Sequence, residues 1–128
     1  MILVDTDVMI WYSRGNQRAL DLFDNYTSFN LSVVSYMELL QGMRNKEELR
    51  ILRQALREWN AKVLHISEEI SAKAMFYVER HYLSHALEMA DALIAATAIS
   101  YGLPLLTAND KHYRVIKEVT IRRFRPEQ

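Results

Sequence analysis

Acidic and amide side chains follow several apolar runs of this chain, at points where strands are predicted to end. Asp5 comes directly after the first apolar run, and Asn109 and Asp110 follow a later one. Glu38 lies one helical turn beyond another run. Ligands bind at the carboxyl ends of strands in open parallel sheets, so we expect these oxygen-bearing side chains to meet at one edge of a sheet.

Asp91 carries the strongest chemical signal because it interrupts an otherwise apolar helix. The helix predicted over residues 87–101 places Asp91 on the same face as Leu87 and Ile94, and we expect that face to pack on the sheet. An unpaired carboxylate is costly to bury, and no lysine or arginine lies within one turn of Asp91 along the sequence. A bound cation is therefore the simplest compensation.

The chemistry of these side chains predicts a hard divalent cation. Crowded carboxylates resist ionisation, and a divalent ion reverses this effect. The chain of 128 residues contains no cysteine, which excludes zinc fingers, iron–sulfur clusters and thiol nucleophiles. We expect Mg²⁺ or Mn²⁺ at this edge, and hydrolysis of a phosphodiester by activated water. Whether one ion or two bind stays open.

Most of these acids also have a structural interpretation. Asp5 can end a strand and begin a turn, and Asp7 is predicted as the N-cap of the next helix. Ser35 and Glu38 have the spacing of a capping box. Asp110 is a candidate cap for a short helix. Capping and ligand roles are compatible at Glu38, and Asp7 lies close enough to reach an ion through water.

Strand-like and helix-like segments alternate along the chain. The predicted strands are residues 1–4, 31–34, 62–66, 105–107 and 119–124. The predicted helices are residues 7–12, 16–26, 35–43, 45–59, 87–101 and 110–117, together with one capped by Ser67. This alternation predicts one α/β domain over residues 1–128, a three-layer α/β/α sandwich around a mainly parallel sheet of four to five strands.

Composition narrows the class of protein further. Apolar residues make up 50% of the chain and charged residues 25%, as in an ordinary globular domain. No apolar run reaches the ~18–20 residues that span a bilayer, and the first residues lack the basic leader of a signal peptide. We therefore expect a cytoplasmic protein with no membrane segment.

The net charge of zero means that any nucleic-acid surface must come from segregated charge. The predicted helix over residues 45–59 carries Arg50, Arg53 and Arg57 on one stripe. Residues 109–128 hold six basic against three acidic side chains, with the densest cluster at residues 122–125. Either stripe could steer an RNA backbone, although for any single arginine a solvated surface is the favoured interpretation.

Three segments resemble the PIN domain family, and in particular the VapC-type toxin ribonucleases of bacterial and archaeal toxin–antitoxin pairs. They are the opening MILVDTDVMIW, the segment VVSYMELLQG, and the stretch ADALIAATAISYGLPLLTANDKHY. The resemblance implies a metal-dependent endoribonuclease in which Asp5, Glu38 and Asp91 surround Mg²⁺ or Mn²⁺. It also implies an RNA substrate, a cognate antitoxin protein and a homodimer.

The resemblance also marks a departure close to the last motif. The family often carries a fourth acid two residues after the Ser or Thr that ends the strand, and here Asn109 occupies that place with Asp110 beside it. Asn109 can still coordinate an ion or orient water. Thr107 can hydrogen-bond an acid or a phosphate, so all three residues belong to the candidate catalytic set.

Two alternatives remain at this point. The triplet Asp5-Thr6-Asp7 resembles the start of haloacid-dehalogenase-type phosphatases, although Met9 departs from their motif and their downstream lysine and paired acids are not found. The Asn109 departure also allows a catalytically idle PIN-like protein that only binds RNA or a partner.

Overall fold

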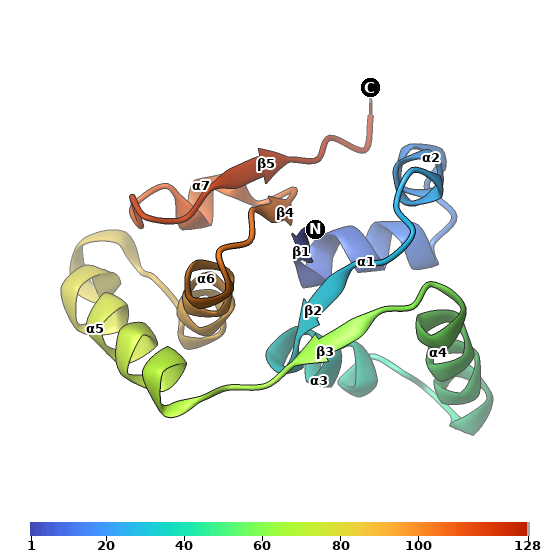
Figure 1. The fold of residues 1–128 in the computed structure, drawn as a ribbon, viewed down its shortest axis with the longest axis horizontal. Helices are drawn as coiled ribbons and strands as arrows, with labels where there is room; N and C mark the ends of the chain where they lie inside the picture. Colours follow the sequence, from blue (N-terminus) through green and yellow to red (C-terminus); the bar gives the residue numbers. More distant parts are fainter. Residues whose placement is uncertain (128) are drawn as a thin grey trace.

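The computed structural model describes residues 1–127 and contains a parallel sheet of five strands in the order β3-β2-β1-β4-β5 (Figure 1). The strands are β1 (Leu3–Val4), β2 (Asn30–Ser32), β3 (Lys62–Leu64), β4 (Leu105–Thr107) and β5 (Ile121–Arg123). The predicted fold class is therefore confirmed. The last residue of the predicted domain, Gln128, lies outside the described residues.

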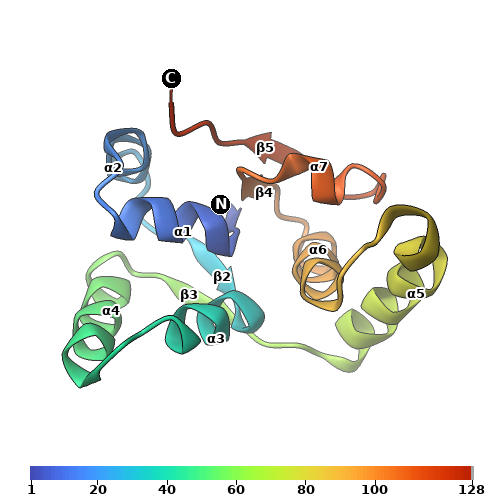
Figure 2. The same cartoon turned by 180° about the vertical axis from the view of Figure 1, so that it is seen from behind.

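Helices cover both faces of this sheet. They are α1 (Thr6–Ser13), α2 (Gln17–Asp24), α3 (Val33–Gln41), α4 (Lys46–Glu58), α5 (Glu68–His85), α6 (Met89–Tyr101) and α7 (Asp110–Tyr113). Figures 1 and 2 show α5 and α6 on one side and α1, α2 and α4 on the other. Within residues 1–127, no helix is both long enough and apolar enough to cross a membrane.

The central strand β1 is short, and its side chains are buried on both faces of the sheet. Leu3 packs into the cluster that includes residues of α5 and α6, whereas Ile2 and Val4 pack into the cluster beneath α1 and α2. All three side chains are fully buried. Because β1 pairs with β2 on one side and β4 on the other, its end is the point where later segments converge.

Local signals define the ends of several helices. The side chains of Asn45 and Ser67 accept hydrogen bonds from backbone N–H groups three residues later. The N-cap predicted at Ser67 is therefore confirmed, and Asn45 caps α4 in the same way. Gly102 ends α6 with a φ of 66°, a left-handed conformation that costs glycine little. The predicted start of α6 is two residues too early, because buried Leu87 extends the apolar pattern beyond the helix.

The start of α3 corrects the predicted capping box. Ser32 is the N-cap, and its hydroxyl accepts a hydrogen bond from the N–H of Val34 at 3.1 Å. Ser35 lies inside the helix with a buried hydroxyl that has no hydrogen-bond partner. The β-branched pair Val33 and Val34 favours a longer strand in the sequence, but the buried Ser32 ends that strand and begins the helix.

The start of α1 corrects a second prediction. Asp5, not Asp7, is the N-cap, and its Oδ1 accepts a hydrogen bond from the N–H of Thr6 at 2.8 Å. The helix therefore begins one residue earlier than predicted, directly at the end of the strand. Asp7 lies in the first helical turn, which frees its carboxylate for a tertiary contact.

The cap of α3 can be tested by two neighbouring serine substitutions. We expect Ser32→Ala to lower the free energy of unfolding by about 1 kcal/mol, because it removes the capping oxygen. Ser35→Ala is the matched control, with a change within about 0.5 kcal/mol, since its hydroxyl bonds to nothing. Urea unfolding measures both values, and a greater loss at Ser35 would contradict the observed helix start.

Candidate active site

The candidate site lies at the carboxyl edge of the sheet, where β1 and β4 end side by side. Asp5 follows β1, and Thr107 is the last residue of β4. Asp91 comes from the first turn of α6, and Tyr113 is the last residue of α7. Segments separated by most of the chain thus contribute polar side chains to one small region.

Asp5 is nearly fully buried, with 5% of its surface exposed. Its Oδ2 accepts hydrogen bonds from the Thr107 hydroxyl at 2.8 Å and from the Tyr113 hydroxyl at 2.9 Å. Burial raises the pKa of Asp5, the hydrogen bonds oppose that shift, and the charge of Glu38 adds to it. The carboxylate is held in one orientation by donors on both sides.

Tyr113 connects Asp5 to Asp91. Its hydroxyl lies 2.9 Å from Asp5 Oδ2 and 3.5 Å from Asp91 Oδ1, so its single hydrogen points to Asp5 while Asp91 lies at the outer limit of hydrogen bonding. Burial and the charges of Asp5 and Asp91 raise the Tyr113 pKa, which keeps this hydroxyl protonated. No sequence pattern singles out Tyr113, because an aromatic residue in a polar segment gives no signal of its own.

Asp91 is half-buried, and a histidine lies beside its carboxylate. Burial raises the pKa of Asp91 to about 6; His112 opposes this shift, while the charge of Asp5 adds to it. The Nδ1 of His112 lies 3.7 Å from Asp91 Oδ2, and His112 itself is mostly exposed. Within residues 1–127, no lysine or arginine pairs with Asp91.

Glu38 reaches the site through Thr6. The Thr6 hydroxyl donates a hydrogen bond of 2.7 Å to Glu38 Oε1, and Thr6 is the residue after Asp5. Glu38 is exposed at the rim, in contrast to the buried Asp5. A sequence pattern does not reveal this contact, because Thr6 and Glu38 lie on different helices.

Asp7 adds another carboxylate beside Asp5. Its Oδ2 accepts a hydrogen bond from the N–H of Ala108 at 3.1 Å, whereas its Oδ1 is buried without a partner. Burial and the charge of Asp5 raise the pKa of Asp7 to about 7. A buried carboxylate oxygen with no donor indicates a site that is short of positive charge.

Asn109 and Asp110 lie beyond Thr107 but have different surroundings. The N–H of Asn109 donates to the Thr107 hydroxyl at 2.9 Å, and the Asn109 side chain is exposed at the site edge. The two carboxylate oxygens of Asp110 each bind an arginine at 2.9 Å, Arg114 and Arg125. Asp110 therefore joins α7 to the segment after β5, and its charge is already neutralised.

The donor chemistry fits a hard divalent cation held by few protein ligands. The candidate ligands are carboxylates, and Asp5 and Asp91 flank the same hydroxyl. Within residues 1–127, no three His, Asp or Glu side chains are arranged to hold one ion. Mg²⁺ commonly binds through one or two carboxylates and keeps several waters, so the pair Asp5 and Asp91 meets its requirements.

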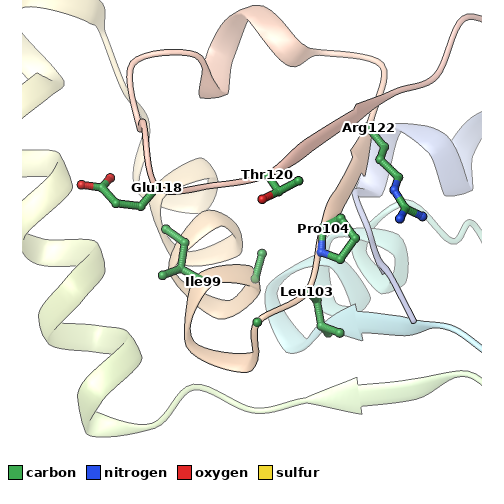
Figure 3. A pocket seen from close by; sticks show the side chains of 8 residues that line it. Ile99, Leu103, Pro104, Glu118, Thr120 and Arg122 are labelled. Carbon is green, nitrogen blue, oxygen red and sulfur yellow. The ribbon is translucent and has the colours of Figure 1, made fainter.

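A separate cavity of about 210 Å³ lies at the opposite edge of the sheet. It is lined by the turn after α6, including Gly102 and Pro104, and by residues that precede or form β5. Figure 3 shows Glu118 and Arg122 at opposite sides of it. This position is at the amino ends of the strands, away from the acids and from the edge where parallel sheets bind ligands.

Acids at the carboxyl edge of a parallel sheet make this a candidate metal-binding site of an α/β protein. The model of the PIN domain family matches residues 2–118, so the chain belongs to that family. It is 34% identical over 123 residues to ribonuclease VapC10 of Mycobacterium tuberculosis, across 93% of this chain and 90% of that protein. The predicted resemblance to VapC-type proteins is confirmed.

Solved structures have the same fold. A chain in a toxin–antitoxin complex from Klebsiella pneumoniae has a TM-score of 0.79 and 24% identity, covering 100% of this chain and 99% of that one. A chain in FitAcB from Neisseria gonorrhoeae has a TM-score of 0.71 and 25% identity, covering 98% of each. The phosphatase alternative is set aside by this family membership, although Asp5 and Asp7 match its opening pattern.

The Tyr113 contact predicts a specific loss of stability. We expect Tyr113→Phe to lower the free energy of unfolding by about 1–3 kcal/mol, because it removes a donor from the buried Asp5 carboxylate. Tyr77→Phe is the matched control and should cost less, since Tyr77 donates at 3.2 Å to Glu118 in a less buried setting. Equal losses for the two variants in urea unfolding would contradict the role assigned to Tyr113.

The raised pKa of Asp7 predicts a pH dependence. The folded value of about 7 exceeds the usual 3.8, so between these values the folded state binds more protons and stability falls as pH rises. Asp7→Asn removes this contribution, so its stability relative to wild type should grow by on the order of 4 kcal/mol from about pH 4 to about pH 8.

Urea unfolding across that pH range tests this expectation. The exposed Asp24→Asn is the control, and its difference from wild type should stay constant with pH. A pH profile of Asp7→Asn that runs parallel to wild type would show that Asp7 is not responsible for the decline.

Proposed function

We propose that this protein is a metal-dependent endoribonuclease, the toxin component of a type II toxin–antitoxin pair, which hydrolyses RNA phosphodiesters with activated water. The observation that carries the proposal is the meeting of Asp5 and Asp91 at the Tyr113 hydroxyl, on the carboxyl edge of the sheet. Similarity to ribonuclease VapC10 supports the reaction and the substrate class.

The proposed cation is Mg²⁺ or Mn²⁺, which Asp5 and Asp91 would hold, with the carboxylate of Glu38 at the rim of the same site. Such a cation supplies positive charge to the phosphate and activation of the water nucleophile. Asp5 and Asp91 must be ionised for this role, and the raised pKa of each is reversed by a nearby positive charge. Asp7 adds negative charge to the same edge.

The side chains around these acids act by positioning. Thr107 and Tyr113 are buried and donate their hydroxyls to Asp5, so neither is free to attack phosphorus. Thr6 orients Glu38. Asn109, exposed beside Thr107, is placed to contact water or a phosphate oxygen. Asp110 is left out of the proposed ligand set, because Arg114 and Arg125 occupy both of its oxygens.

The proposed partners are an RNA substrate, a cognate antitoxin protein and a second copy of this chain in a homodimer, all in the cytoplasm. The similarity to a chain in a toxin–antitoxin complex supports the antitoxin. Apolar side chains exposed on α5 support a contact with another chain; they include Met75, Phe76, Tyr82 and Leu83.

A catalytically idle protein that binds RNA or a partner is the second candidate. One feature favours it: an amide, Asn109, occupies the position where the resemblance to the PIN family implies an acid. It predicts binding without turnover, so an assay of cleavage separates the two candidates.

Cleavage of a labelled RNA pool by purified protein tests the nuclease. We expect cleavage with Mg²⁺ or Mn²⁺ and none with EDTA, and about a 10²–10³-fold loss in Asp91→Asn, the scale of removing one preorganised charged group. The exposed Asp24→Asn on α2 is the matched control and should retain full activity.

The ends of the products test the reaction type. Attack by water, with no side-chain nucleophile, should leave 5′-phosphate and 3′-hydroxyl ends. Products with 2′,3′-cyclic phosphate would instead indicate attack by the ribose hydroxyl and contradict the proposed reaction. Binding of RNA without cleavage under every metal condition would favour the idle protein.

A further inference from the structure

A basic groove lies between α2 and the end of β5. Its volume is about 520 Å³, and three of its lining residues are arginines, Arg18, Arg123 and Arg125, against one acid, Asp21. The arginines of the predicted cluster at residues 122–125 do not all line this groove, because Arg122 lines the cavity at the amino ends of the strands. Arg18, which no sequence pattern connects to this cluster, completes the groove from the other side.

Buried apolar side chains and a hydrogen bond between two segments hold the groove together. Leu106 and Phe124 form its apolar base and are nearly fully buried. The side-chain amide of Asn16, the N-cap of α2, donates to the carbonyl of Pro126 at 3.2 Å. This bond ties α2 to the segment after β5, and Figure 1 shows that segment passing towards α2. The arginines of the groove therefore come from two elements, α2 and the end of β5, that are hydrogen-bonded to one another.

One end of the groove meets the candidate active site. Arg123 pairs in register with Thr107, and the N–H of Phe124 donates to the Thr107 carbonyl at 2.8 Å. The Thr107 hydroxyl in turn donates to Asp5. A single strand leaving the acids in this direction would therefore enter the groove beside Arg123.

Two of the groove arginines carry charge that residues 1–127 do not neutralise. Neither Arg18 nor Arg123 forms an ion pair with an acid among residues 1–127, whereas Arg125 binds Asp110 and is held in place. On α4, by contrast, Arg50 pairs with Glu47 at 2.6 Å. Arg53 and Arg57 of that stripe form no ion pair among residues 1–127 either. The pairing of Arg123 with Thr107 beside the acids is therefore what favours the groove as the phosphate-binding surface.

We infer that this groove binds the phosphate backbone of single-stranded RNA on one side of the cleaved bond, with Arg18 and Arg123 as the phosphate ligands. The inference rests on the proposed ribonuclease function and adds the path of the substrate. Guanidinium groups match phosphate geometry, and backbone contacts position a strand without reading its sequence. Positive charge here also offsets the repulsion between phosphates and the acids.

Binding in EDTA tests the groove without cleavage. Fluorescence anisotropy of a short fluorescein-labelled single-stranded RNA is measured for wild type, Arg18→Gln, Arg123→Gln and the double variant. We expect the double variant to bind about tenfold more weakly or worse, and the slope of log affinity against log salt to fall by about 0.7 for each phosphate that the variant no longer neutralises. Arg50→Gln on α4 is the matched control and should change neither quantity.

Three results would overturn the inference, and they differ from a failure of the nuclease. If the double variant keeps wild-type affinity and salt slope while cleavage proceeds, the groove is not the RNA path. If Arg50→Gln weakens binding equally, the effect is one of overall charge. If the double variant keeps RNA binding but loses binding of a labelled poly-glutamate peptide, the groove serves an acidic protein segment. Wild-type protein that neither binds nor cleaves RNA would instead reject the proposed function.

Discussion

Burial of the Asp5 carboxylate at the end of the central strand is the constraint on which this edge of the molecule depends. Removing a carboxylate from water is costly unless donors or a cation compensate. Thr107 and Tyr113 supply two donors, and the first N–H of α1 supplies a third. These donors fix the direction of Asp5 but do not neutralise the charge that it shares with Asp7 and Asp91, and this imbalance makes the edge receptive to a cation.

The sequence is sufficient to predict which acids lie at the carboxyl edge of the sheet. It does not predict the hydrogen bonds between the side chains there. The acid that ends β1 and the acid at the start of α6 can be found because each interrupts an apolar pattern. Ser32 is missed as a cap because strand preference at Val33 outweighs it locally, and tertiary burial decides the boundary. Tyr113 and Thr6 are missed because their roles depend on partners far away in the chain, which periodicity does not encode.

Charge is sorted by position in this chain of zero net charge. In the part of the chain that the structure describes, carboxylates that form no ion pair with a lysine or arginine lie at the end of β1. Asp110, only a few residues from Thr107, is instead bound by two arginines. The same Arg125 that neutralises Asp110 also lines the groove beside β5. The ion pair between Arg125 and Asp110 thus neutralises Asp110 and holds Arg125 in the groove.

The pairing of β1 with β4 has a consequence for synthesis of the protein. Thr107 lies 102 positions after Asp5 and Tyr113 lies 108 positions after it. A ribosome must therefore add 102 residues after Asp5 before Thr107 is made, and 108 before Tyr113 is made. Prematurely terminated chains that stop before β4 lack those donors and one neighbour of the central strand, so incomplete products cannot assemble the carboxylate cluster in this form.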